Sequence, residues 1–183
     1  MRNNLLTKNL KFSIDGEVKV ATWEHILQLY QNNPTNKGLK IVKNLTENHF
    51  NKDIIPKIKV KYALLLFSQT VGKTMGYLAE NGKLPEETKE TADFIIFIDN
   101  LFDSLNGSMK NSSIRSGKDL LRNITPNSKH KEVWVQAKVI LNSMTFITSK
   151  GSAGTVPSIT NWIKTVENMG ILKEKLFNEY KIK

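Results

Sequence analysis

The sequence of 183 residues contains no cysteine and has no long apolar run. The missing cysteine excludes disulfide bonds, thiolate metal sites and cysteine nucleophiles. No apolar run approaches the roughly 18 residues that a membrane helix needs. At the N-terminus, Arg2 is followed by Asn3 and Asn4 rather than by the apolar core of a signal peptide. We therefore expect a protein that is not secreted and has no membrane partner.

Acidic residues are few compared with basic ones. Lysine and arginine number 27 and aspartate and glutamate 17, so the formal net charge is +10 and the isoelectric point is about 9.7. This charge suits a polyanionic partner such as DNA, although a basic face that meets only solvent is equally compatible with it. A chain of this length can bury about 70% of the surface of its unfolded state, so it needs no disulfide or metal to fold.

The hydrophobic pattern predicts a mostly α fold with a small N-terminal β-hairpin. Residues 11–20 alternate apolar and polar side chains around Asp15 and Gly16, a pair that is typical of a hairpin turn. Thr22 is the expected N-cap of the first helix. Gly107 is the expected left-handed C-cap of the helix over 84–106. The spacing predicts helices over about 22–31, 39–48, 56–80, 84–106, 128–144 and 158–180.

Motifs that would indicate catalysis are absent or incomplete. The segment 71–74 looks like the end of a phosphate-binding loop, but Phe67 stands where that motif requires its first glycine, and the segment lies in an expected helix. The three histidines share no ligand spacing with carboxylates. Asp99 and Asp103, one helical turn apart, could hold a magnesium ion, but such a pair is more often a solvated face. The sequence therefore predicts no catalytic residue and no metal ligand.

Residues 101–107 carry a cluster that suits a purine base. At 100° per residue, Asn106 lies about 40° from Phe102 and about 60° from Asp103 on the expected helix. The Phe102 ring could stack on guanine, whose N1–H and N2–H₂ groups would donate to the carboxylate. The amide could serve O6 or N7. Taken alone, an ordinary helix terminus, with Phe102 in the core and Asn106 at the helix end, is the more common explanation of these residues.

Further motifs follow one another along nearly the whole chain. The most specific are GKLP at 82–85, TADFI at 91–95 and NLFDSLNG at 100–107; the others are RNNLL at 2–6, ATWEHILQLY at 21–30, LTENH at 45–49, KIKVKYA at 57–63, Ser68, WIKTV at 162–166 and Leu172. With these motifs the chain resembles the GTP-binding insertion domain of P-element-type DNA transposases, including their domesticated relatives with a THAP domain.

The resemblance implies a helical domain that binds GTP with Mg²⁺ and does not hydrolyse it. By motif, Phe102 would stack on guanine, while Asp103 and Asn106 would read its edge. Val60 and Ser68 would line the nucleotide site. The family has a nucleotide-contacting lysine directly before Leu-Thr, whereas here Asn44 stands at that position and Lys43 precedes it. Lys43 is therefore the expected substitute for that contact.

In that family the insertion interrupts an RNase H-like catalytic domain. The family's catalytic aspartate precedes the Arg-Asn-Asn-Leu motif, and its last catalytic acid would follow Lys183, so the chain starts after one acid and stops before the other. Residues 1–21 are then expected to be a hairpin remnant of the flanking domain and 22–183 the GTP-binding insertion. DNA strand transfer needs carboxylates that hold two metal ions about 4 Å apart, so we expect no catalysis by the chain alone.

Three hypotheses for the function remain open at this stage. The first is a GTP-binding module that acts with transposon DNA in a nuclear or nucleocytoplasmic transposase. The second is a basic helical module that binds DNA without nucleotide, which the charge of +10 allows. The third is an atypical GTPase, which is weaker because no glycine-rich phosphate cradle is present.

Overall fold

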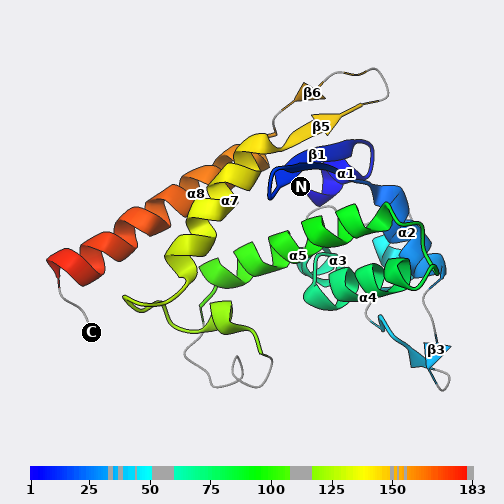
Figure 1. The fold of residues 1–183 in the computed structure, drawn as a ribbon, viewed down its shortest axis with the longest axis horizontal. Helices are drawn as coiled ribbons and strands as arrows, with labels where there is room; N and C mark the ends of the chain where they lie inside the picture. The colour runs from blue at the N-terminus through cyan, green and yellow to red at the C-terminus, as the bar shows by residue number, and fades with distance from the viewer. Residues whose placement is uncertain are drawn as a thin grey trace. The chain divides into compact units, whose positions relative to one another are not determined.

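The structure, a computed structural model, describes residues 1–32, 35–36, 39–43, 45–50, 60–107, 117–148, 151, 153–154 and 156–180. It is mostly α-helical with a small β-sheet, as the sequence predicts (Figure 1). The chain divides into two compact units. Unit 1 contains Met1–Asp99 and Thr145–Gly154, and unit 2 contains Asn100–Met144 and Thr155–Lys183. Over the described ranges, no helix combines the length and the apolar character that crossing a membrane requires.

A sheet of four strands in the order β2-β1-β5-β6 belongs to unit 1. Its predicted hairpin is confirmed: Asp15 and Gly16 both have positive φ angles, 52° and 83°, which is the conformation of a type I′ turn. The sequence did not predict that β1 also pairs with a segment far along the chain. The strands are β1 (Asn9–Ile14), β2 (Glu17–Ala21), β5 (Thr145–Ile147) and β6 (Ala153–Gly154), all antiparallel to their neighbours.

The first long helix of unit 1 begins where the sequence predicts. Thr22 is its N-cap, and the Thr22 side chain accepts a hydrogen bond from the backbone N–H of His25 at 3.2 Å. The Thr91 hydroxyl, buried on a later helix, accepts from the backbone N–H of Thr22 at 3.1 Å and lies 2.7 Å from Nδ1 of His25. The helices of this unit are α1 (Arg2–Leu5), α2 (Trp23–Gln31), α3 (Val60–Leu66), α4 (Gln69–Glu80) and the part of α5 (Thr88–Leu105) that ends at Asp99.

The prediction of one long helix over 56–80 is wrong, because the segment forms two helices. Its expected start at Pro56 lies outside the described residues. α3 ends at Leu66, and α4 begins after Ser68. The Ser68 hydroxyl donates to the Leu65 carbonyl at 3.0 Å and accepts from the Val71 N–H at 3.4 Å. A serine that bonds to nearby backbone in this way competes with the helical ladder, and here it ends one helix and caps the next.

The short helix expected over 39–48 is also wrong. Strand β4 (Leu39–Lys40) pairs with β3 (Thr35–Asn36) in a separate two-stranded sheet. The first helical turn in this region is a 3₁₀ turn, Glu47–His49, with Thr46 as its N-cap. The backbone N–H of Thr46 donates to Nδ1 of His49 at 3.1 Å. Pairing between strands decided the local structure here, because the segment is too short for helical spacing to be specific.

The core of unit 1 is built around Phe94 of α5. Its ring centroid lies 5.8 Å from that of Phe12 on β1 and 5.6 Å from that of Phe67 after α3. Helix α4 meets α5 at Gly72, where an added Cβ would lie 2.6 Å from Cγ1 of Ile96 and 3.2 Å from the Ala92 carbonyl. One turn along α4, a Cβ at Gly76 would meet only the Ala92 methyl at 4.0 Å. The two glycines therefore differ sharply in the space around them.

We expect Gly72→Ala and Gly76→Ala to shift stability in opposite directions. Alanine favours a helix over glycine by up to about 1 kcal/mol, and at Gly76 nothing opposes this gain. At Gly72 the new methyl group must displace a β-branched side chain and backbone, which outweighs the gain and leaves a net loss of about 1–2 kcal/mol. Urea unfolding followed by circular dichroism measures both variants. Equal shifts would mean that α4 and α5 are not in close contact at Gly72.

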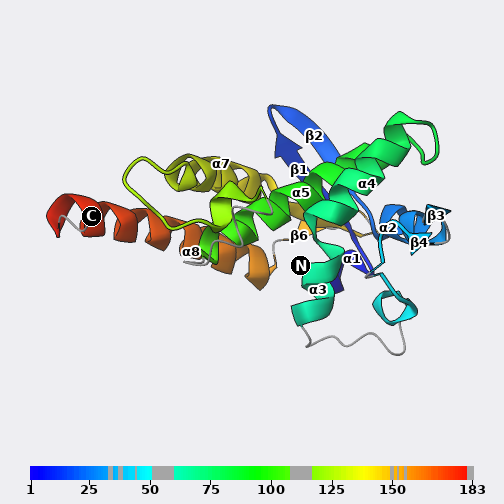
Figure 2. The same cartoon turned by 90° about the horizontal axis from the view of Figure 1, so that it is seen from below.

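Unit 2 contains the end of α5, a 3₁₀ turn η2 (Asp119–Leu121), α7 (His130–Ser143), α8 (Pro157–Glu174) and a π-helical turn (Lys175–Glu179). The predictions of helices over 128–144 and 158–180 are thus confirmed. Helices α7 and α8 lie side by side in both ribbon views (Figure 1, Figure 2). Two ion pairs join them, Lys131–Glu174 and Lys138–Glu167, each at 2.6 Å between Nζ and Oε1. Trp134 and Leu141 of α7 and Val166 of α8 are buried.

Candidate functional site

The last turn of α5 is fixed in unit 2 by a buried hydrogen-bond chain. Nε1 of Trp134 on α7 donates to the Ser104 hydroxyl at 3.0 Å, and that hydroxyl donates to the Leu101 carbonyl at 2.8 Å. Leu101 and Ser104 have no exposed surface, and Trp134 is only 2% exposed. Because Leu101 and Ser104 face inward, their neighbours Phe102 and Asp103 are held at a defined rotation about the helix axis.

Asp103 forms an ion pair with Lys118. The distance from Lys118 Nζ to Asp103 Oδ2 is 2.6 Å, and the two side chains are 23% and 10% exposed. A carboxylate that is buried to this degree has lost most of its water, so an opposite charge is needed to stabilise it. With the ammonium beside it, the carboxylate stays ionised and can only accept hydrogen bonds.

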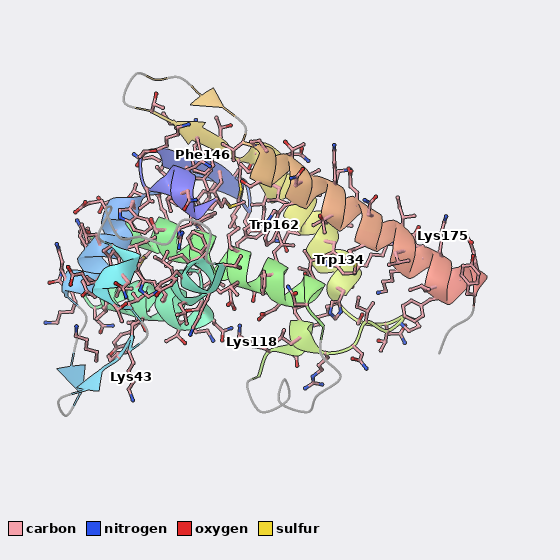
Figure 3. The ribbon with its side chains drawn as sticks, turned by 180° about the vertical axis from the view of Figure 1, so that it is seen from behind. Lys43, Lys118, Trp134, Phe146, Trp162 and Lys175 are labelled. Carbon is pink, nitrogen blue, oxygen red and sulfur yellow. The ribbon has the colours of Figure 1, made fainter. Side chains whose placement is uncertain are left out.

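The segment that carries Lys118 is held in place on its C-terminal side. Gly117 has a φ of 66°, a left-handed conformation that favours glycine, and the η2 turn follows directly. The Leu120 carbonyl in that turn lies 3.0 Å from Nε2 of buried His130; since a carbonyl only accepts, this nitrogen carries the proton. Burial lowers the pKa of His130, against a smaller opposing effect of the Leu120 carbonyl, so the ring stays neutral. Figure 3 marks Lys118 near the end of α5.

Asn106 and Phe102 are linked through the helix end. Nδ2 of Asn106 donates to the Phe102 carbonyl at 2.7 Å, so the Asn106 amide satisfies one of the last carbonyls of α5. Asn106 is exposed and Phe102 half-buried. The amide nitrogen has a second hydrogen that a ligand acceptor could use. Gly107 does not have a positive φ, so its expected role as left-handed C-cap is wrong; Asn106 serves the helix end instead.

The other three candidate residues belong to unit 1. Val60 is the first residue of α3 and is 64% exposed, whereas half-buried Ser68 already hydrogen-bonds to backbone on both sides. Lys43 is exposed and follows the β3–β4 hairpin (Figure 3). The ligand contacts of these residues stay predictions.

Sequence reasoning missed Lys118, because nothing in the local pattern links it to a carboxylate fifteen positions earlier in the chain. As for metals, no group of three or more histidine or acidic side chains that could hold an ion occurs among the residues that the structure describes.

Comparison with known proteins gives two matches of different kinds. A family model described as "TNP-like, GTP-binding insertion domain" matches residues 1–118, a range that includes all six candidate residues and Lys118. The chain matches no curated protein. A solved structure described as a Drosophila P element transposase strand transfer complex is similar, with a TM-score of 0.74 and 21% sequence identity.

That similarity covers 99% of this chain and 38% of the chain in the complex. The chain therefore spans well under half of the length of the solved relative. At this level of identity the similarity establishes the fold, and it confirms the mostly α architecture. The family model covers more than half of the 183 residues, so the chain belongs to the TNP-like GTP-binding insertion domain family of transposases.

Proposed function

We propose that the chain is a module that binds GTP without hydrolysing it and derives from a P-element-type transposase. Membership of a family described as GTP-binding supports this. The observation that carries the proposal is the cluster of Phe102, Asp103 and Asn106 at the end of α5, in which Asp103 is ion-paired with Lys118 and the Asn106 amide bonds to the Phe102 carbonyl. This cluster accounts for the choice of base as well as for binding.

The carboxylate of Asp103 suits guanine and opposes adenine. Guanine presents two donors, N1–H and N2–H₂, to a group that can only accept. Adenine presents one donor, N6–H₂, and one acceptor, N1, so one of its groups would face a carboxylate oxygen without a hydrogen between them. A buried polar group left unpaired costs about 1–3 kcal/mol, which is roughly 5- to 150-fold in affinity.

The nucleotide's phosphates would bring Mg²⁺ with them. Magnesium in nucleotide sites is commonly held by substrate phosphates, water and one or two carboxylates rather than by a protein cage. A magnesium ion held mainly by the phosphates needs no cluster of acidic side chains. The residues that the structure describes contain no such cluster. Lys43, Val60 and Ser68 are proposed as further nucleotide contacts from the sequence motifs alone.

The proposal extends to a longer protein that acts on transposon DNA in the nucleus. Residues 1–21 would then belong to a flanking RNase H-like domain, and 22–183 to the insertion. Alone, the module would neither cut nor join DNA, since that chemistry needs carboxylates around two metal ions. The net charge of +10 favours a second candidate function, salt-sensitive DNA binding without nucleotide.

We expect GTP to raise the melting temperature of the purified chain. A ligand at 100 times its dissociation constant stabilises the folded state by about 2.7 kcal/mol, which shifts the melting temperature of a domain of this size by roughly 5–10 °C. ATP at the same concentration, with the same magnesium, is the control and should shift it far less. A melt unchanged by GTP would overturn the proposal and leave DNA binding without nucleotide as the better account.

A further inference from the structure

A groove of about 440 Å³ lies between helices α7 and α8 of unit 2. Each helix lines it with a stripe of side chains at positions i, i+4 and i+7, which share one face of a helix. In both stripes the first and last residues are charged and the middle one is apolar. The stripe on α7 is Lys131, Val135 and Lys138, and the stripe on α8 is Glu167, Ile171 and Glu174.

The apolar part of this face is exposed. Val135 is 61% exposed and Ile171 54%, and Val139, one turn beyond Val135 on α7, is 67% exposed. Valine is a weaker helix former than a polar residue such as glutamate or lysine, so helix stability does not explain valines at exposed positions. Apolar side chains gathered on one face and flanked by charges are typical of an interaction surface.

The charges on this face are separated by helix. Both cations belong to α7 and both anions to α8, and each Lys–Glu pair spans 2.6 Å between Nζ and Oε1. The pairing of Lys131 with Glu174 and of Lys138 with Glu167 shows that the helices run antiparallel. The four side chains are between 41% and 55% exposed, so each can still meet a second opposite charge. A surface with one positive and one negative edge can be complementary to itself.

We propose that this face binds a second copy of the chain, with the two-fold axis parallel to the helices. The two helix pairs then form a four-helix bundle in which α7 lies opposite the partner's α8. Lys131 meets the partner's Glu174, and Lys138 meets the partner's Glu167, so charges alternate at both ends of the groove. Val135 and Ile171 of both copies are buried between these charges.

The charges oppose the other way of placing the two faces together. If the axis crossed the helices at right angles, α7 would lie on the partner's α7, and α8 on the partner's α8. Lys131 would then face the partner's Lys138, and Glu167 the partner's Glu174. Like charges placed together in an interface are costly, so the charge pattern selects the pairing of α7 with the partner's α8.

The size of the face indicates a weak and reversible dimer. The 14 residues of α7 span about 21 Å, and two packed helices are about 20 Å wide, which gives roughly 400 Å² in projection on each copy. Stable interfaces bury about 800 Å² on each partner, and smaller ones belong to transient complexes. We therefore expect a dissociation constant in the micromolar range.

Sedimentation equilibrium of the full chain tests the dimer without any nucleotide. Between about 5 and 500 µM, we expect the average mass to rise from 20.8 kDa towards twice that value. Val135→Asp buries an unpaired charge in the interface and should raise the dissociation constant by about tenfold or more. Gln136→Asp is the matched control: it adds the same charge at an exposed position 100° around α7 and should leave the dissociation constant nearly unchanged. Circular dichroism confirms that both variants keep their helicity.

Cysteine cross-linking tests the pairing, because the chain has no cysteine of its own. With a short bismaleimide, a mixture of Val135→Cys and Ile171→Cys chains should give more cross-linked dimer than either variant alone. More cross-linking of Val135→Cys with itself would show that α7 lies on the partner's α7, and the proposed pairing would be wrong. A constant mass of one chain at every concentration, or equal effects of Val135→Asp and Gln136→Asp, would overturn the dimer at this face.

Discussion

Replacing Asp103 with asparagine is expected to weaken GTP binding by roughly 5- to 150-fold and to favour xanthosine triphosphate relative to GTP. Asparagine presents an amide N–H₂ group where the carboxylate oxygen stood, so two donors would face each other across the guanine edge. Xanthine carries a carbonyl at position 2 instead of an amino group, and the new amide can donate to it. Competition against a fluorescent guanine nucleotide measures both affinities.

Asp93→Asn is the matched control for this change. Asp93 lies on the same helix, and its Oδ2 pairs with Lys19 Nζ at 2.6 Å, the same distance as in the Asp103–Lys118 pair. It is no part of the proposed base reader, so neither affinity should change. If Asp103→Asn keeps its helicity and still binds GTP as the unaltered chain does, the cluster at the end of α5 is an ordinary helix terminus.

Trp134→Ala is expected to reduce the free energy of unfolding by about 3–5 kcal/mol, the usual cost of truncating a large buried aromatic side chain. The Trp134 side chain is buried between α7 and the end of α5 and makes a T-shaped contact with His130 at 5.8 Å between ring centroids. Its loss also removes the donor to Ser104. Urea unfolding followed by far-ultraviolet circular dichroism measures the change without relying on tryptophan fluorescence.

Trp134→Phe separates the two contributions. It keeps most of the apolar contact and removes only the indole N–H, so the loss from the missing hydrogen bond should be about 0.5–1.5 kcal/mol, with a smaller cavity term added. An alanine variant as stable as the parent would show that α7 does not anchor the end of α5. We expect the free energy of unfolding to be highest for the parent, lower for Trp134→Phe and lowest for Trp134→Ala.

Local signals in the sequence were sufficient where a few neighbouring residues decide the structure. Asp15 and Gly16 form the hairpin turn, and Thr22 caps α2, because both features depend on backbone within three residues. Gly82, with a φ of 64°, follows the end of α4, and its N–H donates to the Ala79 carbonyl; an Asn-Gly pair is a local signal of such a helix end.

Signals failed where distant segments or a single side chain decided the outcome. Strand β5 forms because residues 145–147 pair with β1, and no pattern of three residues predicts that. Ser68 breaks a helix that its apolar neighbours favour, through two local bonds that periodicity does not reveal. Lys40 belongs to a strand of two residues, which is too short to carry a period.

The same division holds for the candidate site. The convergence of Phe102, Asp103 and Asn106 follows from helical geometry, so spacing alone places them together. The ion pair with Lys118 depends on how residues 117–122 fold back on α5 and α7, which is tertiary structure. The sequence therefore predicts which residues could recognise the base, whereas the ion pair at Asp103 is seen only in the structure.

Isothermal titration calorimetry of GTP into the unaltered chain, with magnesium in both solutions, tests the central claim most directly. We predict a saturable heat with a stoichiometry of about one nucleotide per chain, and no saturable heat from ATP over the same concentration range, because only guanine matches an ionised carboxylate with two donors. Heats of GTP that equal those of dilution, or titrations of GTP and ATP that cannot be distinguished, would contradict the assignment of the α5 end as a guanine site.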